Sequence, residues 1–290
     1  LRALIKTVRP HQWAKNLFVV APLAFSKHLL DPEYVALSAL AFIIFSLLSG
    51  SVYLVNDIFD IDKDRAHPKK KLRPIPSGEL SLGAARTAAA LLIVASLAAS
   101  IASFGLPFFA CAASYLLLNL AYSMSFKHVP FLDVLSIASG FLLRVLAGAF
   151  ALSVPASPWL LICTFVLACF LGFGKRTHEL ATAGERAKEQ RAVLSKYNLG
   201  HLKLILWVLA LATTAAYVLY TISPQTTAFF GTTRLLYTSP FALIGVVRFL
   251  RLVSNKASAD SPTDEMLHDI PFMANLVLWG VTTMTIIYIL

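Results

Sequence analysis

Residues 35–68 read VALSALAFIIFSLLSGSVYLVNDIFDIDKDRAHP, an apolar run that ends in a dense group of acidic residues. A helix of about 20 apolar residues crosses a hydrocarbon core of roughly 30 Å, and this run has that length. Pro68 ends the helical pattern soon after the acids, because proline disfavours a helical conformation in the residue before it. The stretch therefore predicts a membrane-spanning helix whose last turns carry a cluster of acidic residues with a functional role.

The composition extends this prediction to the whole chain. Hydrophobic residues make up 58% of the 290 residues and charged residues only 14%, whereas soluble domains have roughly 25% charged and 45–50% apolar residues. The three cysteines, Cys111, Cys163 and Cys169, lie inside apolar runs and show neither pairing nor metal-ligand spacing. They are predicted to be buried apolar side chains. We expect an integral membrane protein.

The other apolar runs predict the architecture. Short links at Gly105–Pro107 and Ser153–Pro158 indicate hairpin turns between neighbouring helices. We predict an all-α integral membrane protein, in which a single transmembrane helical domain over 1–290 is a bundle of about nine helices. The predicted spans are 16–30, 35–56, 82–104, 106–126, 131–152, 157–174, 203–222, 235–251 and 270–290.

The basic residues predict the orientation. Of the 25 Lys and Arg residues, all except Lys27, Arg144 and Arg234 fall on one side if nine spans alternate. Basic loops stay in the cytoplasm, which places the N-terminus inside, the C-terminus outside and the loops at 56–80 and 174–203 in the cytoplasm. We expect a multi-pass protein of the inner (plasma) membrane. Nucleic acid is not an expected partner, because the basic loops are few and lack interleaved aromatic residues.

The acidic group follows a helical register. At 100° per residue, Asp57, Asp60 and Asp64 share one face of the helix. Asn56 lies beside them, and Asp62 points away. Like charges at a helix C-terminus repel each other and are poorly solvated near a membrane. A Mg²⁺ ion resolves both problems, because it binds one or two carboxylates together with substrate phosphates.

The segment after the acids is basic. Lys69–Lys71 precede Arg73, which lies between two predicted turns. A metal ion held by acids bridges some of the oxygens of a diphosphate, and nearby Lys or Arg side chains bind its other oxygens. Acids followed by basic residues therefore predict a Mg²⁺–diphosphate site. Taken alone, Lys69–Lys71 could anchor the chain at lipid headgroups. The acids, mixed with Lys63 and Arg65, could also form a solvated helix end.

The pattern Asn-Asp-x-x-Asp-x-x-x-Asp is formed here by Asn56, Asp57, Asp60 and Asp64. It resembles the first signature of the UbiA-type intramembrane prenyltransferase superfamily, and the resemblance covers essentially the whole chain. It implies a nine-helix bundle whose active site opens to the cytoplasm, with a lateral route for a polyprenyl chain.

A second stretch distinguishes between branches of this superfamily. Members that use a prenyl diphosphate carry a second acidic motif near the sixth span, whereas residues 173–179 of this chain read FGKRTHE. Together with residues 9–16, RPHQWAKN, and the element Tyr122–Lys127, this stretch resembles the polyprenyl-phosphate phosphoribosyltransferase branch, typified by decaprenyl-phosphate phosphoribosyltransferase. The product of that branch feeds arabinan precursor synthesis in the cell wall.

The resemblance implies a reaction in which a 5-phosphoribosyl group passes from phosphoribosyl diphosphate (PRPP) to a polyprenyl phosphate, with release of pyrophosphate. Its partners are these two substrates and the lipid bilayer. Asp57 and Asp60 are then the catalytic residues, and together with Asp64 they bind Mg²⁺. No general base and no catalytic histidine is expected, because the lipid phosphate is already an anion. The implied substrate-binding residues are Lys15, Asn56, Asp64, Arg65, Arg73, Tyr122, Lys127, Arg144, Lys175 and Arg176.

Alternatives stay open for the function and for several residues. A prenyltransferase that moves a prenyl group from its diphosphate to an aromatic or other small acceptor would share the first motif. A transporter would place ionisable groups near midspan, where this chain has only Arg144.

The candidate residues have alternatives of their own. Lys15, Tyr122 and Lys127 could be interface anchors. Asp133 could be a helix N-terminal acid or a ribose ligand. Arg144 could bind phosphate or form a structural ion pair. The sequence is compatible with a homo-oligomer.

Overall fold

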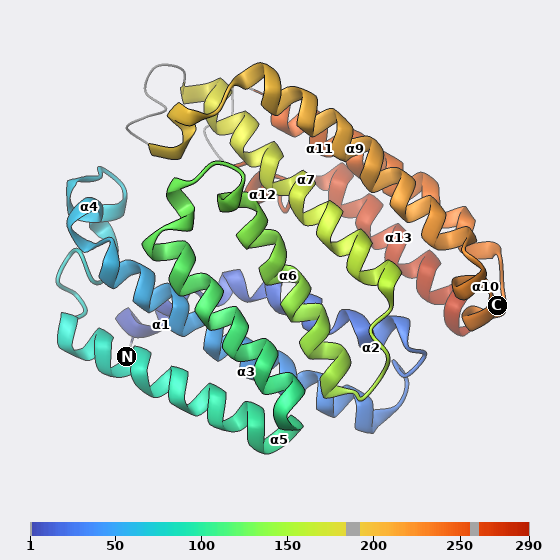
Figure 1. The fold of residues 1–290 in the computed structure, drawn as a ribbon, viewed down its shortest axis with the longest axis horizontal. Helices are drawn as coiled ribbons and strands as arrows, with labels where there is room; N and C mark the ends of the chain where they lie inside the picture. The colour runs from blue at the N-terminus through green and yellow to red at the C-terminus, as the bar shows by residue number, and fades with distance from the viewer. Residues whose placement is uncertain (1, 184–191, 256–260, 290) are drawn as a thin grey trace. The chain divides into compact units, whose positions relative to one another are not determined.

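The computed structural model describes residues 2–183, 192–255 and 261–289, and these residues form helices and connecting turns without a β-strand (Figure 1). The all-α prediction is therefore confirmed for this part of the chain. The chain divides into two compact units. Unit 1 comprises Leu1–Phe126 and Gly140–Ala156, and unit 2 comprises Lys127–Ser139 and Ser157–Leu290.

Unit 1 is built around the long helix α3, Pro32–Phe59. Asp31 caps its start by accepting a hydrogen bond from the backbone N–H of Glu33 at 3.1 Å. Pro32 occupies the first turn, where a backbone N–H has no partner inside the helix. The shorter elements of this unit are α1 (Arg2–Val8), η1 (Pro10–Val19), α2 (Ala21–Phe25), α4 (Ile61–Ala66) and η2 (Lys70–Leu72).

Helix α5, Leu82–Met124, consists of two arms joined at Gly105. The backbone of Gly105 has φ 75° and ψ −168°, which residues with a Cβ rarely adopt, and Pro107 removes an N–H from the helix. Figure 1 shows that the chain reverses direction there, so the two arms run antiparallel. The hairpin predicted at Gly105–Pro107 is present, and its arms correspond to the predicted spans 82–104 and 106–126.

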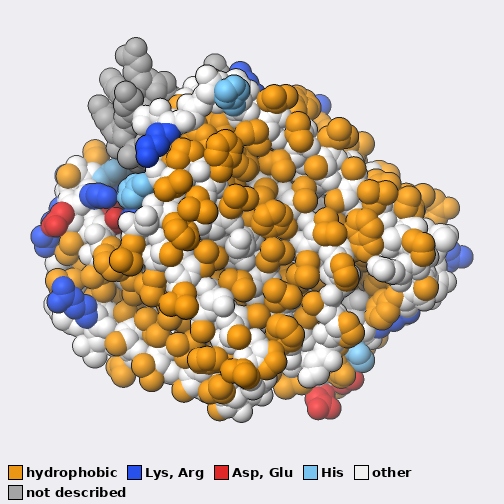
Figure 2. Space-filling model, viewed as in Figure 1, with side chains coloured by type: hydrophobic (Ala, Val, Ile, Leu, Met, Phe, Trp, Pro, Cys, Tyr) orange, Lys and Arg blue, Asp and Glu red, His pale blue; other side chains and the backbone are white. Residues whose placement is uncertain are grey.

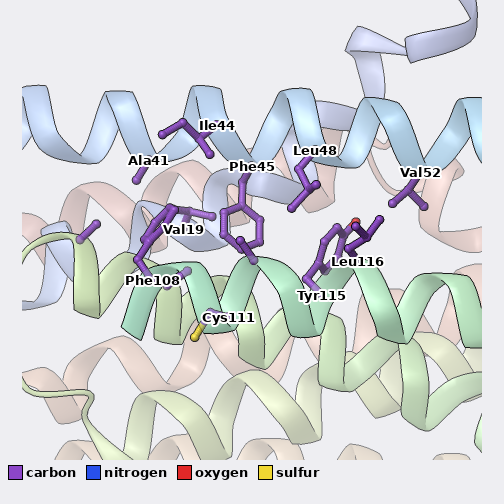
Figure 3. Close-up of a cluster of buried hydrophobic side chains, with 13 residues drawn as sticks. Val19, Ala41, Ile44, Phe45, Leu48, Val52, Phe108, Cys111, Tyr115 and Leu116 are labelled. Carbon is purple, nitrogen blue, oxygen red and sulfur yellow. The ribbon is translucent and has the colours of Figure 1, made fainter. Parts of the chain in front are cut away.

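The core of unit 1 lies between α3 and the second arm of α5 (Figure 3). Phe45 and Phe108 are fully buried, and their rings meet edge to face with 5.7 Å between centroids. Helix α6, Leu132–Ala151, approaches η1 closely, since a Cβ on Gly148 would lie 2.0 Å from the carbonyl oxygen of Val19. Lipid is as apolar as a leucine side chain, so such close packing is what holds membrane helices together.

Unit 2 is centred on α7, Pro158–Ala183, which packs against α9 (Leu199–Ile222) and α11 (Ser239–Ser254). The rings of Phe170 and Phe249 meet edge to face with 5.1 Å between centroids. The shorter helices of this unit and the last long one are η3 (Phe126–His128), η5 (Ala192–Lys196), α10 (Pro224–Phe230), η6 (Arg234–Thr238), α12 (Pro262–Glu265) and α13 (Ile270–Tyr288).

The predicted loop 174–203 differs from the structure at its start. Helix α7 continues past Gly174 to Ala183, so Lys175 and Arg176 lie on a helix. Gly174 permits the close packing of α11 on this part of α7, because a Cβ there would lie 2.4 Å from the Phe249 ring. Residues 184–191 of the predicted loop lie outside the described residues.

Seven helices among the described residues are long and apolar enough to span a membrane, whereas nine spans are predicted from the sequence. One difference is α5, whose two arms count as a single helix. The other is the predicted span 16–30, which forms the 3-10 helix η1 and the five-residue helix α2. The apolar run there is short and contains Pro22, which ends a regular hydrogen-bond ladder.

The surface supports a lipid environment. Figure 2 shows a face on which hydrophobic side chains cover most of the visible area. Leu91 and Val94 on α5 and Leu211 on α9 are among many large apolar side chains that are more than half exposed. Apolar surface on this scale is unfavourable in water and ordinary in a bilayer.

Candidate active site

The acidic group lies where α3 ends and α4 begins. Asp60 is the C-cap of α3, and its backbone N–H donates to the carbonyl of Asn56 at 3.0 Å. The N–H of Asp64 in turn donates to the carbonyl of Asp60 at 2.8 Å, so the helical path is only locally disturbed. Asp57 and Asp64 are buried, at 2% exposure each. The side chain of Asp62 is 92% exposed and points away, as predicted.

A single nitrogen of Arg73 contacts both buried acids. Its Nη1 donates to Asp64 Oδ2 at 2.6 Å and to Asp57 Oδ1 at 3.1 Å. The turn after η2 positions Arg73, whose backbone N–H donates to the carbonyl of Lys70 at 3.0 Å. The sequence-based prediction that Arg73 lies at the acidic site is consistent with this geometry.

Arg9 is the second cation at these acids. Its Nη2 donates to Asp57 Oδ1 at 2.7 Å, and its guanidinium carbon lies 5.1 Å from the centroid of the Tyr53 ring. Arg9 precedes η1 with φ 55° and ψ 65°, in the left-handed region. We did not predict Arg9 as a site residue. Its signal in the sequence is an arginine directly before a proline in the segment RPHQWAKN.

A buried polar network fixes the other end of η1. Asn16 donates from Nδ2 to the hydroxyls of Ser46 at 3.1 Å and Ser49 at 3.0 Å, both on α3. Its Oδ1 accepts from Arg144 Nε at 2.8 Å. Arg144 also donates to the hydroxyl of Tyr115 at 2.9 Å, and its guanidinium carbon lies 4.5 Å from that ring's centroid.

The positive charge of Arg144 is therefore stabilised by neutral groups. It is 6% exposed, and it forms no ion pair with a carboxylate among the described residues. Its Nη1 donates to the carbonyl of Gly140 at 3.0 Å. Of the two interpretations open for Arg144, the structural ion pair is not present among the described residues, where an aromatic face and amide and hydroxyl oxygens take the place of an acid. Phosphate binding by Arg144 stays a prediction.

The second arm of α5 ends beside the acids. Asn56 accepts a hydrogen bond at Oδ1 from the hydroxyl of Ser123. Tyr122, the neighbouring residue, is half-buried at the same end of the arm. Two other candidates in unit 1 lie at the surface, Lys15 on η1 and Arg65 on α4, where Arg65 pairs with the exposed Asp62 at 3.8 Å.

The donor set of unit 1 fits a hard divalent cation that also binds a substrate. No cluster of three or more acidic, His or Cys side chains able to hold a metal occurs among the described residues. Asp57 and Asp64, however, both point at Arg73 Nη1, so one cation position already lies between two carboxylates. Mg²⁺ commonly takes one or two carboxylates and completes its shell with phosphate oxygens and water. These two residues therefore fit that metal.

A second buried ion pair lies in unit 2. Arg176 on α7 donates from Nε to Asp133 Oδ2 at 2.7 Å and from Nη1 to Glu179. Tyr197 donates to Asp133 Oδ1 at 2.6 Å and accepts from the backbone N–H of Phe131 at 2.5 Å. Burial, and then the hydrogen bond to Asp133, raise the pKa of Tyr197 above its ordinary value. Arg176 and Asp133 are almost fully buried, at 2% and 0%.

The structure thus places the predicted site residues in two groups. In unit 1, Asp57, Asp64 and Arg73 come together with the unpredicted Arg9, and Asp60 does not join them in a cluster of three acids. In unit 2, Arg176 is held by Asp133 and Glu179, and Lys127 and Lys175 are half-buried on the same unit. For Asp133 a helix N-terminal role and a ribose-binding role were open; it lies in the first turn of α6 and forms an ion pair there with Arg176.

The sequence of this chain matches known proteins over most of its length. A model of the UbiA prenyltransferase family matches residues 17–276. The decaprenyl-phosphate phosphoribosyltransferase of Mycolicibacterium smegmatis is 37% identical over 227 residues, which are 76% of this chain and 70% of that protein. The protein of the same name from Corynebacterium glutamicum is 34% identical over 220 residues, 75% of this chain and 66% of that protein. The chain therefore matches about two thirds of the length of these relatives.

Solved structures show the same fold. A UbiA homologue from Archaeoglobus fulgidus, bound to DMAPP and Mg²⁺, has a TM-score of 0.73 over 99% of both chains, at 17% sequence identity. The structure of a digeranylgeranylglyceryl phosphate synthase has a TM-score of 0.69 at 18% identity and covers 100% of this chain. At such identities the likeness concerns the helical fold alone.

Proposed function

The chain belongs to the UbiA prenyltransferase family, and we propose that it transfers a 5-phosphoribosyl group from PRPP to a polyprenyl phosphate. It is a multi-pass membrane transferase. The relatives at 34–37% identity are phosphoribosyltransferases by name, and this supports the same activity here. The observation that carries the proposal from the site is its charge pattern. One pair of buried acids, Asp57 and Asp64, faces two arginines, and residues 173–179 carry Lys175 and Arg176 where a second acidic motif would otherwise be expected.

The reaction balances without a proton transfer. An anionic oxygen of the lipid phosphate forms a bond to the anomeric carbon of the ribose as the bond from that carbon to the diphosphate breaks. Pyrophosphate leaves with both electrons of that bond. No residue needs to act as a general base, because the nucleophile is already ionised. The protein's contribution is to position the two substrates and to neutralise the leaving group.

Asp57 and Asp64 would hold Mg²⁺, with Asp60 at the helix junction as the third ligand that the sequence predicts. The bound ion would supply charge neutralisation to the diphosphate as it leaves. Arg73 lies where it can bind a diphosphate oxygen, since it already contacts both acids. Asn56, fixed by Ser123, would orient Asp57 or a ribose hydroxyl.

The remaining phosphate groups need cations of their own. We assign Lys15, Tyr122, Lys127 and Lys175 as candidates for binding the ribose 5-phosphate or the lipid phosphate, with Arg65 at the site's rim. Arg144 and Arg176 are given positioning roles, because their guanidinium groups are occupied by protein partners. The polyprenyl chain would lie in the bilayer, with the acidic site at the cytoplasmic side of the inner membrane, and the product would enter arabinan precursor synthesis.

Pyrophosphate release by the purified protein tests the proposal. With Mg²⁺, PRPP and a polyprenyl phosphate, release should require both substrates and should disappear in Asp57→Ala. Asp62→Ala is the matched control, because that side chain is exposed and points away from the site. Turnover of a prenyl diphosphate with an aromatic acceptor, and none with PRPP, would replace this function by that of a prenyltransferase with the same fold and acidic site.

A further inference from the structure

We infer that Arg9 is a substrate-binding residue that exchanges partners: it holds Asp57 in the free protein and binds the diphosphate when a metal–diphosphate complex takes the carboxylates. The inference rests on the proposed function and extends it to a residue outside the acidic motif and the basic loop. Arg73 makes the same exchange beside it.

The charges of the free site balance. Arg9 and Arg73 both donate to the same atom, Asp57 Oδ1, at 2.7 and 3.1 Å, and Arg73 also binds Asp64 Oδ2. Two positive charges therefore face two negative ones. A divalent cation between the two carboxylates would lie close to two guanidinium groups and would be repelled by both. Metal alone should accordingly bind weakly, and the arginines must leave the carboxylates for it to bind well.

The arginines can leave because they are the more exposed partners of each pair. The side chains of Arg9 and Arg73 are 24% and 31% exposed, whereas those of Asp57 and Asp64 are 3% exposed. Arg9 donates to Asp57 from one nitrogen only, so the other N–H groups of its planar guanidinium can donate to other acceptors. Phosphate oxygens are the acceptors that such a fork binds best, often through two parallel hydrogen bonds. A diphosphate with its metal thus supplies a new anion for each arginine that it displaces.

The backbone of Arg9 is held in place during this exchange. The segment η1 runs antiparallel to α3, with Arg9 at Asp57 and Asn16 at Ser46 and Ser49. The two paths match in length. From Ser49 to Asp57 the α-helix rises about 12 Å at roughly 1.5 Å per residue. From Arg9 to Asn16 a 3-10 helix rises about 14 Å at roughly 2.0 Å per residue. With Asn16 fixed by Arg144, only the Arg9 side chain has to move.

Metal binding and diphosphate binding should therefore respond to Arg9→Gln with opposite signs. The full chain in detergent is titrated with Mn²⁺ alone, as a paramagnetic substitute for Mg²⁺, and the free ion is measured by electron paramagnetic resonance. Loss of one competing charge should tighten Mn²⁺ binding by up to about tenfold, whereas affinity for PRPP at saturating Mg²⁺ should fall by about tenfold or more. Inorganic pyrophosphate with Mg²⁺ should follow the same trend as PRPP.

Two variants serve as controls. Arg9→Lys keeps the charge and should leave Mn²⁺ affinity close to that of the unmodified protein, while it weakens diphosphate binding through loss of the planar fork. Arg86→Gln removes an exposed arginine of unit 1 that forms no ion pair with an acid in the part of the chain that the structure describes, and it should change neither affinity. Thermal unfolding of each variant shows that the fold is retained.

The outcomes separate this inference from the proposed function. If Arg9→Gln weakens Mn²⁺ binding, or leaves the affinities for Mn²⁺ and PRPP unchanged, Arg9 only holds η1 against α3 and the inference is wrong. If the opposite-sign response appears with pyrophosphate but neither protein binds PRPP, the exchange stands and the phosphoribosyl substrate is wrong.

Discussion

Each unit of this protein contains buried carboxylates paired with arginine, and the two pairings differ in which partner is buried. In unit 1, Asp57 and Asp64 are buried, but Arg9 and Arg73 remain about a quarter to a third exposed. In unit 2, Arg176 and Asp133 are both almost fully buried, and Tyr197 adds a hydrogen bond to the acid. When both residues of an ion pair are buried, neither can take a new partner without leaving the other as an uncompensated buried charge. The difference separates an ion pair that we propose exchanges its partners for substrate from one that is closed to exchange.

Removal of the shared acid in unit 1 should have the largest effect on activity. Asp57 accepts from both arginines and is a proposed metal ligand, so Asp57→Ala should reduce pyrophosphate release by roughly 10²–10³-fold or more. Asp62→Ala should leave the rate unchanged. Rates are measured with both substrates saturating. Equal loss in the two variants would mean that the acids act only through the net charge of the helix end.

Removal of the arginine in unit 2 should have the largest effect on stability. Arg176→Ala leaves Asp133 buried without its cation and should lower the free energy of unfolding by about 3–5 kcal/mol. Arg9→Gln, which removes a partly exposed partner, should cost less than about 1 kcal/mol. Thermal unfolding of the two variants in the same detergent compares them. If they prove equally destabilising, the contrast between an exchangeable and a permanent pair fails.

Loss of the η1 anchor should have an intermediate effect that reaches the acidic site. Asn16→Ala removes hydrogen bonds to Ser46, Ser49 and Arg144, which should destabilise the protein by about 1–3 kcal/mol and weaken PRPP binding, because Arg9 is no longer held at Asp57. Ser46→Ala removes one of these bonds and should have a smaller effect on both. PRPP affinity that stays constant in Asn16→Ala would show that η1 is positioned by its packing alone.

The smallest effect is expected at Tyr197. Tyr197→Phe removes the hydrogen bond to Asp133 and should cost about 0.5–1.5 kcal/mol near neutral pH, with no change in metal or PRPP affinity. The pKa of Tyr197 is raised in the folded protein, so its contribution is fully present below the ordinary value of 10.0 and is lost as the pH rises through the folded pKa. The stability difference between the two proteins, followed by thermal unfolding from pH 8 to 11, should shrink above pH 10. A difference that grows there would contradict this assignment.

The sequence predicted those features that depend on one helix and its immediate neighbours. Helical periodicity predicted Asp57, Asp60 and Asp64 on one face with Asp62 turned away. In the structure Asp57 and Asp64 are buried together at Arg73 and Asp62 is exposed, whereas no cluster of three acids forms among the described residues. The glycine and proline at 105–107 predicted a hairpin, because both residues disrupt the same helical turn. The family resemblance led to the phosphoribosyltransferase function, which the names of the relatives support.

Features that depend on contacts between distant segments were missed. The role of Arg9 follows from a 3-10 helix laid along α3 and fixed through Arg144, and no local pattern in residues 9–19 predicts that path. The prediction that residues 16–30 form a regular membrane-spanning helix was wrong, because this segment forms η1 and α2 instead. Arg176 looked like a free phosphate ligand because its partner, Asp133, lies far away in the sequence.

Gly148 lies in the apolar interior of unit 1, remote in sequence from every acid, yet it limits what the acidic site can tolerate. A methyl group at this position would collide with the carbonyl of Val19 at the end of η1, and backbone at such a contact cannot give way as a flexible side chain would. A shift of η1 would carry Arg9 with it, since Arg9 at one end of the segment and Asn16 at the other both bind α3. We therefore expect Gly148→Ala to act as a substrate-affinity variant although it changes no charged or polar group. The proposed active site of this protein and its lipid-embedded scaffold are under a common steric constraint.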